Sequence, residues 1–236
     1  MTLRPRRTPS VLTTAVALTV VVLAGCSSPT PGPGAETPAA APTSASPSPT
    51  PAPEAPATEI AADVLLPAAA WEPAGPAGAP TPGVTDWRLP ESCAVGAPAT
   101  ASAMLGVEHG DGALESSVGV QQVAVFADAD AAVAEADRVA AALARCAADP
   151  GAPSRYVVEP LAVGAQGLGL ATDYYGTEGD VSTAIGTYLA LTRRGTAVTL
   201  VSAEGGESNV GAAREELTAR AGAAWELLCT YDAEGC

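Results

Sequence analysis

The chain contains a single histidine, and its neighbours are of types that take part in acid–base chemistry. His109 lies between Glu108 and Asp111, and a histidine beside carboxylates can act as a general base or a metal ligand. No second histidine and no serine nucleophile elbow accompanies it. We therefore interpret His109 as a solvated loop residue. The sequence predicts no catalytic residue, no metal site and no cofactor, so we do not expect an enzyme.

Two further motifs resemble ligand loops but lack the required spacing. Asp128-Ala129-Asp130 has alternating acids, yet it lacks the glycine and the terminal glutamate of a calcium loop. Residues 164–169 are rich in glycine, but their spacing differs from that of a phosphate-binding loop and no clear helix follows. We interpret the first motif as a helix N-cap and the second as a loop.

Aromatic residues are scarce, at 4% of the chain, which makes those near predicted loops notable. An aromatic surface with a few polar groups is typical of a small-molecule site. The candidate ligand-binding residues on this basis are Trp71, Trp87, Tyr174 and Tyr175. The alternative for each of them is an ordinary anchor in the hydrophobic core.

Five cysteines are present, and the first follows an apolar run. Arg4, Arg6 and Arg7 precede the apolar residues 11–23, and Leu23-Ala24-Gly25-Cys26 ends the run. This order is typical of a secretory signal peptide, and its last four residues resemble the lipobox of bacterial lipoproteins. We expect residues 1–25 to be removed and Cys26 to carry acyl chains such as palmitate, which would hold the protein on the extracytoplasmic face of the cell membrane. The alternative is an ordinary signal peptide with a chance cysteine.

The other four cysteines form an even set, which in an exported domain favours two disulfides in one of three pairings. Our preferred pairing is Cys93–Cys146 and Cys229–Cys236. These bonds would close loops of about 54 and 8 residues and stabilise the fold by roughly 4 and 2.5 kcal/mol. A zinc site is disfavoured because there is no C-x2-C pair and only one histidine.

The residues that follow Cys26 predict a spacer and then one domain. Residues 26–58 contain ten prolines and no aromatic residue, which is typical of a disordered tether. Residues 59–236 are long enough for one domain with a core. The chain has 11 basic and 26 acidic residues and a net charge of −15. Such an acidic protein disfavours binding to nucleic acid.

Hydrophobic periodicity predicts an α+β domain whose antiparallel-rich sheet is packed by two main helices. Residues 118–126 alternate as a strand, and Asp128 caps a helix that runs to about residue 147. Residues 183–200 predict a hairpin that turns at Gly195, and Asn209 caps the last helix. Residues 94–112 are expected to be irregular or weakly helical, and residues 163–179 are expected to form a loop.

Several of these features together resemble the PknH-like extracellular sensor domain, which occurs on actinobacterial receptor kinases and on free-standing lipoproteins. The matching features are the lipobox with its tether, Val64-Leu65-Leu66, Cys93 before the first strand, the turn at residues 123–129 into a helix that ends at Cys146, and the late hairpin with its terminal helix. The resemblance implies a sheet packed by helices, two disulfides and a ligand-binding cleft.

The expected function is therefore a lipid-anchored domain that binds or senses an unidentified ligand in the cell envelope. The alternative is a structural or scaffolding lipoprotein that contacts an envelope protein without a small ligand. A closed, aromatic-lined cleft would favour the first hypothesis, and an exposed apolar patch would favour the second.

Overall fold

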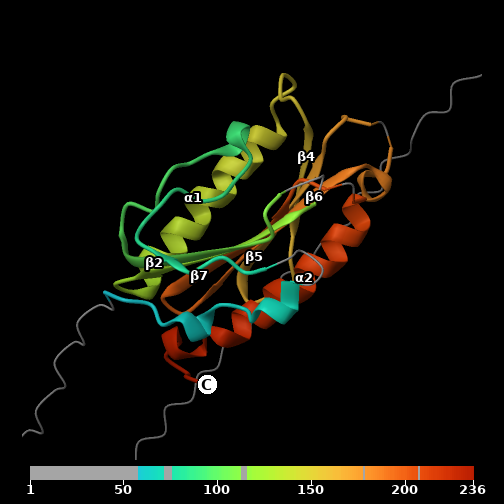
Figure 1. Cartoon of the computed structure of the whole chain (residues 1–236). Helices are drawn as coiled ribbons and strands as arrows, with labels where there is room; N and C mark the ends of the chain where they lie inside the picture. The colour runs from blue at the N-terminus through green and yellow to red at the C-terminus, as the bar shows by residue number, and fades with distance from the viewer. Residues whose placement is uncertain (1–57, 72–75, 113–115, 178, 207) are drawn as a thin grey trace, which may run out of the picture. The chain divides into compact units, whose positions relative to one another are not determined.

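The computed structural model describes residues 58–71, 76–112, 116–177, 179–206 and 208–236 (Figure 1). The predicted signal peptide, Cys26 and nearly all of the predicted tether lie outside these residues. Among the described residues, no helix is both long and apolar enough to cross a lipid bilayer.

Seven antiparallel strands form one sheet in the order β1-β2-β3-β7-β6-β5-β4. The strands are β1 (Thr81–Pro82), β2 (Ala101–His109), β3 (Val118–Phe126), β4 (Arg155–Pro160), β5 (Ala165–Asp173), β6 (Gly186–Arg194) and β7 (Ala197–Glu204). The β6–β7 hairpin joins the half of the sheet made by β1–β3 to the half made by β4 and β5. The predicted α+β class is confirmed.

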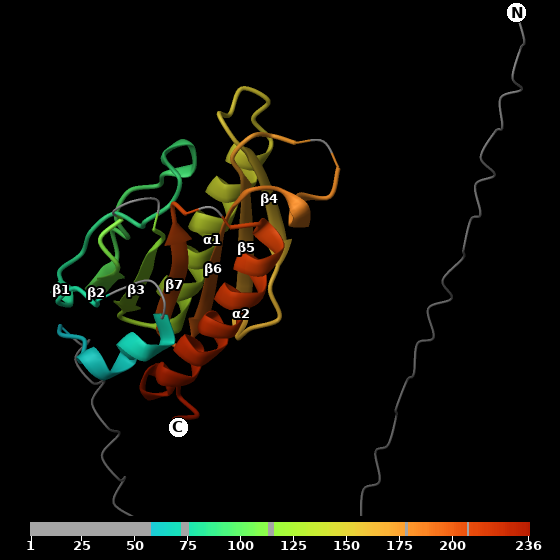
Figure 2. The same ribbon diagram turned by 45° about the vertical axis from the view of Figure 1, so that its right-hand side comes forward.

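Two long helices cover opposite faces of this sheet (Figure 2). The Asp128 carboxylate accepts the Ala131 N–H at the start of α1 (Ala129–Ala147), and the Asn209 side chain accepts the Ala212 N–H at the start of α2 (Val210–Leu227), each at 2.8 Å. Both bonds satisfy an amide that has no partner within its helix. The short 3-10 helices are η1 (Ala62–Val64), η2 (Ala68–Trp71), η3 (Glu91–Cys93), η5 (Val181–Thr183) and η6 (Cys229–Tyr231).

Two strands occupy regions where the sequence predicts irregular structure, and those predictions are wrong. In β2, Met104 packs in the core on the α1 face, whereas Leu105 and Val107 pack on the other face. A strand buried on both faces does not show the alternation that identifies a half-exposed one. In β5, an added Cβ at Gly169 would collide with the Tyr188 hydroxyl, so this glycine allows a close approach and does not mark a loop.

Buried amides on β3 hold two other segments against the sheet. The Gln121 side chain accepts the Leu66 N–H at 2.8 Å and donates to the Val64 carbonyl at 3.3 Å. The Gln122 side chain accepts the Arg88 N–H at 2.7 Å and donates to the Asp86 carbonyl at 3.0 Å. Because successive strand residues point to opposite faces, Gln121 holds its segment on the α2 face and Gln122 holds its segment on the α1 face.

The structure joins the cysteines in the preferred pairing. Cys93 of η3 is bonded to Cys146 near the end of α1, with their Cα atoms 5.2 Å apart, and the pair is separated by 53 positions. Cys229 is bonded to Cys236, with their Cα atoms 4.7 Å apart, across 7 positions. Cys93 and Cys146 are buried in the core on the α1 face.

The two disulfides are expected to stabilise the fold unequally. The C93A/C146A double variant should lose about 4 kcal/mol of unfolding free energy and the C229A/C236A double variant about 2.5 kcal/mol, because the longer loop restricts the unfolded chain more. Urea unfolding followed by tryptophan fluorescence, without reductant, measures both losses. A larger loss in the tail variant would contradict this account of the stabilisation.

Candidate ligand-binding groove

The sheet opens at one end, between its two central strands. Pairing of β6 with β7 ends at Leu189 and Ser202. Beyond that point β6 pairs with β5, and β7 pairs with β3. The Gly186 N–H donates instead to the Ser208 carbonyl at 2.9 Å, so the connection from β7 to α2 bonds to the start of β6. The strands thus separate and leave room for side chains between them.

A groove of about 500 Å³ lies at this opening on the α1 face, and its floor is rich in hydroxyl groups. Thr172 and Thr187 are direct partners on β5 and β6, and Ser202 lies opposite Leu189. Each of these hydroxyl residues is two positions from a core leucine on the same face. The floor therefore changes from leucine to hydroxyl where the strands separate.

Ser202 is the unusual member of this floor. Its side chain is buried, and its Oγ has no hydrogen-bond partner among the described residues. A buried hydroxyl without a partner costs free energy. Because the Oγ atom itself is enclosed, a ligand in the groove would supply the missing bond once this hydroxyl turns toward the groove.

The groove walls are aromatic and held by specific bonds. Residues 87–91, which we call the strap, form one wall, and Tyr156 and Tyr174 form the other. The Trp87 indole N–H donates to Glu135 of α1 at 2.6 Å, and the Tyr156 hydroxyl accepts from Ser92 at 2.8 Å. These bonds fix Trp87 and Tyr156 before any ligand arrives, which lowers the entropy cost of binding.

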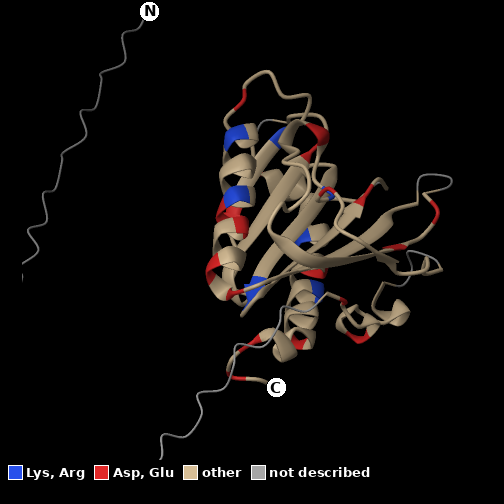
Figure 3. Ribbon diagram, turned by 90° about the vertical axis from the view of Figure 1, so that its left-hand side faces the viewer, with Lys and Arg blue, Asp and Glu red and all other residues tan. Residues whose placement is uncertain are grey.

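The arginine at the groove rim is already paired, whereas the Glu91 carboxylate has no ion-pair partner among the described residues. Arg88 donates from Nε and Nη2 to the two oxygens of Glu204, at 3.1 and 2.6 Å, and lies 3.6 Å from Glu108. The hydrogen bond with Glu204 raises the pKa of Arg88. In the view of Figure 3, acidic and basic residues are interspersed over the ribbon. Among the described residues, no group of three or more His, Cys, Asp or Glu side chains is placed to hold a metal ion.

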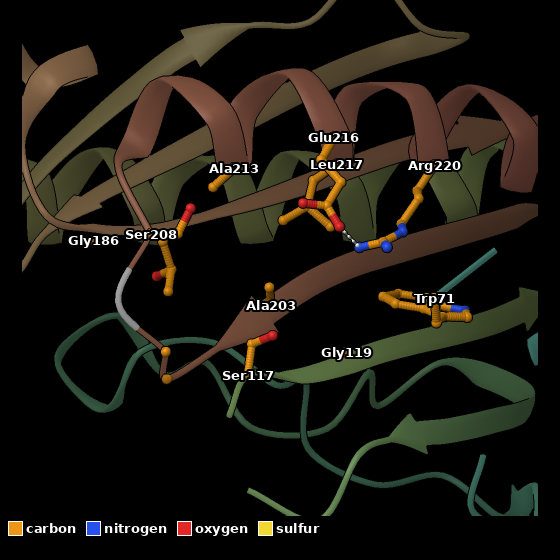
Figure 4. Close-up of a pocket in the computed structure, with 13 residues that line it drawn as sticks. Trp71, Ser117, Gly119, Gly186, Ala203, Ser208, Ala213, Glu216, Leu217 and Arg220 are labelled. Atoms are coloured by element: carbon orange, nitrogen blue, oxygen red, sulfur yellow. Dashed lines mark ion pairs between the residues drawn. The ribbon is translucent and has the colours of Figure 1, made fainter. Parts of the chain in front are cut away.

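A second hollow, of about 230 Å³, lies on the α2 face and contains Trp71 (Figure 4). The Arg220 guanidinium lies 4.6 Å from the centre of the Trp71 ring and forms an ion pair with Glu216 at 2.6 Å. Arg220 Nε also donates to the Ala70 carbonyl at 2.7 Å. Trp71 is fully buried, so it anchors the N-terminal segment to the sheet and α2.

The prediction that His109 is a solvated loop residue is wrong. His109 ends β2, is 1% exposed and stacks on Trp71, with the ring centres 4.8 Å apart. Neither of its ring nitrogens has a hydrogen-bond partner among the described residues. The sequence around it is polar, but the N-terminal segment covers this end of the strand.

The four aromatic candidates do not form one site. Trp87 and Tyr174 line the groove, whereas Trp71 lies on the opposite face. Tyr175 is 72% exposed and borders a neighbouring hollow together with Tyr156. The sequence analysis missed Tyr156 and the floor hydroxyls Thr172, Thr187 and Ser202. A usable signal for the floor was a hydroxyl residue two positions from a leucine in each of three strands.

Comparison with known proteins gives a likeness of structure. No family model matches the chain, and no curated protein matches it. Among solved structures, it is similar to the extracellular domain of PknH from Mycobacterium tuberculosis, with a TM-score of 0.49 and 17% sequence identity. The match covers 74% of this chain and 99% of the PknH domain.

Burial of His109 predicts a specific loss of stability in acid. Burial and the nearby Arg220 guanidinium lower the pKa of His109. Below the ordinary pKa of about 6.5, the unfolded chain therefore takes up a proton that the folded chain excludes. The free energy of unfolding is therefore not reduced by His109 above that pH. It decreases as the pH falls below it.

The matched variant is His109→Phe, which keeps a ring against Trp71 and cannot titrate. Urea unfolding of both proteins at pH 7.5 and 5.5 should show a larger loss for the unaltered protein. Every carboxylate is common to the two proteins, so its contribution cancels in the comparison. Equal losses would show that His109 is not held neutral by the fold.

Proposed function

We propose that this protein is a lipid-anchored extracytoplasmic protein whose domain binds a ligand in the groove between the strap and the ends of β5, β6 and β7. The observation that carries the proposal is the buried, unpartnered hydroxyl of Ser202 in the groove floor. Buried polar groups are nearly always hydrogen-bonded, and an exception calls for an explanation. A bound molecule that supplies the bond is such an explanation.

Location outside the cytoplasm is supported by the cysteines. Cys26 follows a charged and apolar leader in a lipobox. The four cysteines of the domain form two bonded pairs, and structural disulfides persist mainly in oxidising compartments outside the cytoplasm. Lipid on Cys26 would then hold the domain at the membrane surface.

A second candidate function, contact with an envelope protein, is supported by two exposed apolar side chains. Tyr175 is 72% exposed and Ile185 is 44% exposed. They are close in space because the N–H of the preceding Tyr174 bonds to the Ile185 carbonyl at 3.1 Å. A partner protein could cover both, but two side chains make a small patch compared with a stable interface. Ligand binding in the groove therefore remains our first proposal.

Lipid attachment is tested by Cys26→Ala. This change removes the thiol that would carry the acyl chains, and we expect the protein to leave the membrane fraction and to lose incorporation of labelled palmitate. The C229A/C236A double variant is the control, because it removes a disulfide of the domain, leaves no new free thiol and should leave the protein on the membrane. Continued incorporation of labelled palmitate into Cys26→Ala would contradict the proposed anchor.

Occupancy of the groove is tested by native mass spectrometry on the mature protein gently released from its own envelope. We expect a discrete non-covalent mass in addition to the covalent lipid. Thr187→Trp places an indole over the groove floor and should abolish this mass. Thr81→Trp adds the same indole on exposed β1 and should retain it.

Two further observations complete the test of groove occupancy. Equal urea midpoints for the two tryptophan variants would confirm that both proteins are folded. An unaltered protein that carries no ligand, with a cross-linked protein at Tyr175 and Ile185, would instead favour the second candidate function.

A further inference from the structure

We propose that the ligand of the groove is an uncharged glycan, bound through its hydroxyl groups by the floor and through the C–H faces of its rings by the aromatic walls. This inference rests on the proposed function, namely that the groove binds a ligand. It adds the chemical class of that ligand.

The floor favours a ligand rich in hydroxyl groups. Thr172, Thr187 and Ser202 come from three strands and face the same space. A hydroxyl both donates and accepts, so a cluster of them suits a partner that also does both at several positions. The Ser202 Oγ is buried and unpartnered, and an apolar lipid tail over it would leave this penalty in place.

The walls favour a ligand that also has an apolar face. Tyr174 lines the groove together with Leu89 and Pro90 of the strap, and these three side chains are partly exposed. Trp87 and Tyr156 lie behind them, at 3% and 8% exposed. Aromatic side chains offer a large rigid surface at low entropy cost, and the tyrosines add a polar tip. A sugar ring combines an apolar C–H face with hydroxyl groups at its edge, so one ring can meet a wall and the floor together.

The pairing of Arg88 favours an uncharged ligand over an anionic one. Arg88 is the basic residue among those that line the groove. Its Nε and Nη2 atoms both donate to Glu204, and Glu108 lies beside it. An anionic ligand would have to break this ion pair, and it would approach a chain whose net charge is −15. The groove volume of about 500 Å³ lies within the range of small-ligand sites, which suits a short oligosaccharide or a short segment of a longer glycan.

The test uses the mature lipidated protein in a detergent without a sugar head group, since a glycosidic detergent would compete. The protein is applied to an array that carries neutral oligosaccharides, sulfated and carboxylated oligosaccharides, and short peptides. We expect binding to neutral oligosaccharides. The best of these is then titrated by calorimetry against the variants.

Two variants and one control locate the sugar in the groove. Ser202→Ala removes one hydrogen bond and should weaken binding about tenfold. Tyr174→Ala removes a wall and should weaken it about tenfold or more. Ser102→Ala, a serine-to-alanine change on β2 in the other half of the sheet, should leave the affinity unchanged. Unchanged affinity in both groove variants would overturn the proposal.

Identification of the ligand that co-purifies with the natural protein distinguishes two proposals. One is that the groove binds a ligand, and the other is that this ligand is a glycan. Tandem mass spectra with hexose or pentose mass steps would support the glycan. A peptide or lipid that is lost in Thr187→Trp would overturn the glycan and leave the groove as a binding site. A protein that carries no ligand and binds no oligosaccharide on the array would overturn both.

Discussion

Two adjacent buried glutamines on β3 hold two distant segments of the domain against the sheet. Gln121 and Gln122 are both buried in the middle of the sheet, and each amide accepts a backbone N–H and donates to a backbone carbonyl of a segment distant in sequence. An amide buried without these partners would cost free energy. The need to satisfy both amides therefore fixes the N-terminal segment on one face and the start of the strap on the other.

The groove depends on this constraint and on the hairpin that joins the two halves of the sheet. Trp87 lies between the two backbone groups that Gln122 holds, so its side chain enters the wall at a fixed position. The floor exists because β6 and β7 separate after Leu189 and Ser202. One wall and the floor are thus set by bonds within the core, and a rigid scaffold of this kind positions binding side chains accurately.

Much of the fold could be predicted because local signals agreed with tertiary packing. Asp128 and Asn209 cap the helices as expected, and the hairpin turns after Arg194 with Gly195 at φ 52°. The preferred cysteine pairing is also the one in the structure. These features depend on residues near one another in sequence or on the even number of cysteines in the domain.

The failures share a physical cause, which is burial by segments distant in sequence. Strand β2 has core residues on both faces, so its composition shows no alternation. His109 stands among polar residues but is covered by Trp71. The groove floor joins hydroxyls from three strands, and no local pattern records that they meet. In the candidate set, only Trp87 and Tyr174 reach the groove, because the position of an aromatic residue near a loop does not specify a face of the sheet.

The segment that leads to the predicted tether and the groove lie on opposite faces of the sheet. Residues 58–71 lead from the predicted tether into the domain and pack against α2 through Leu66 and Trp71. The groove lies on the other face, beneath the strap. Thr187, Ala203 and Gly205 line both the groove and the Trp71 hollow, so the faces meet at the sheet opening. The segment that leads to the tether therefore leaves the groove uncovered, while it contacts the reverse side of the strands that form the floor.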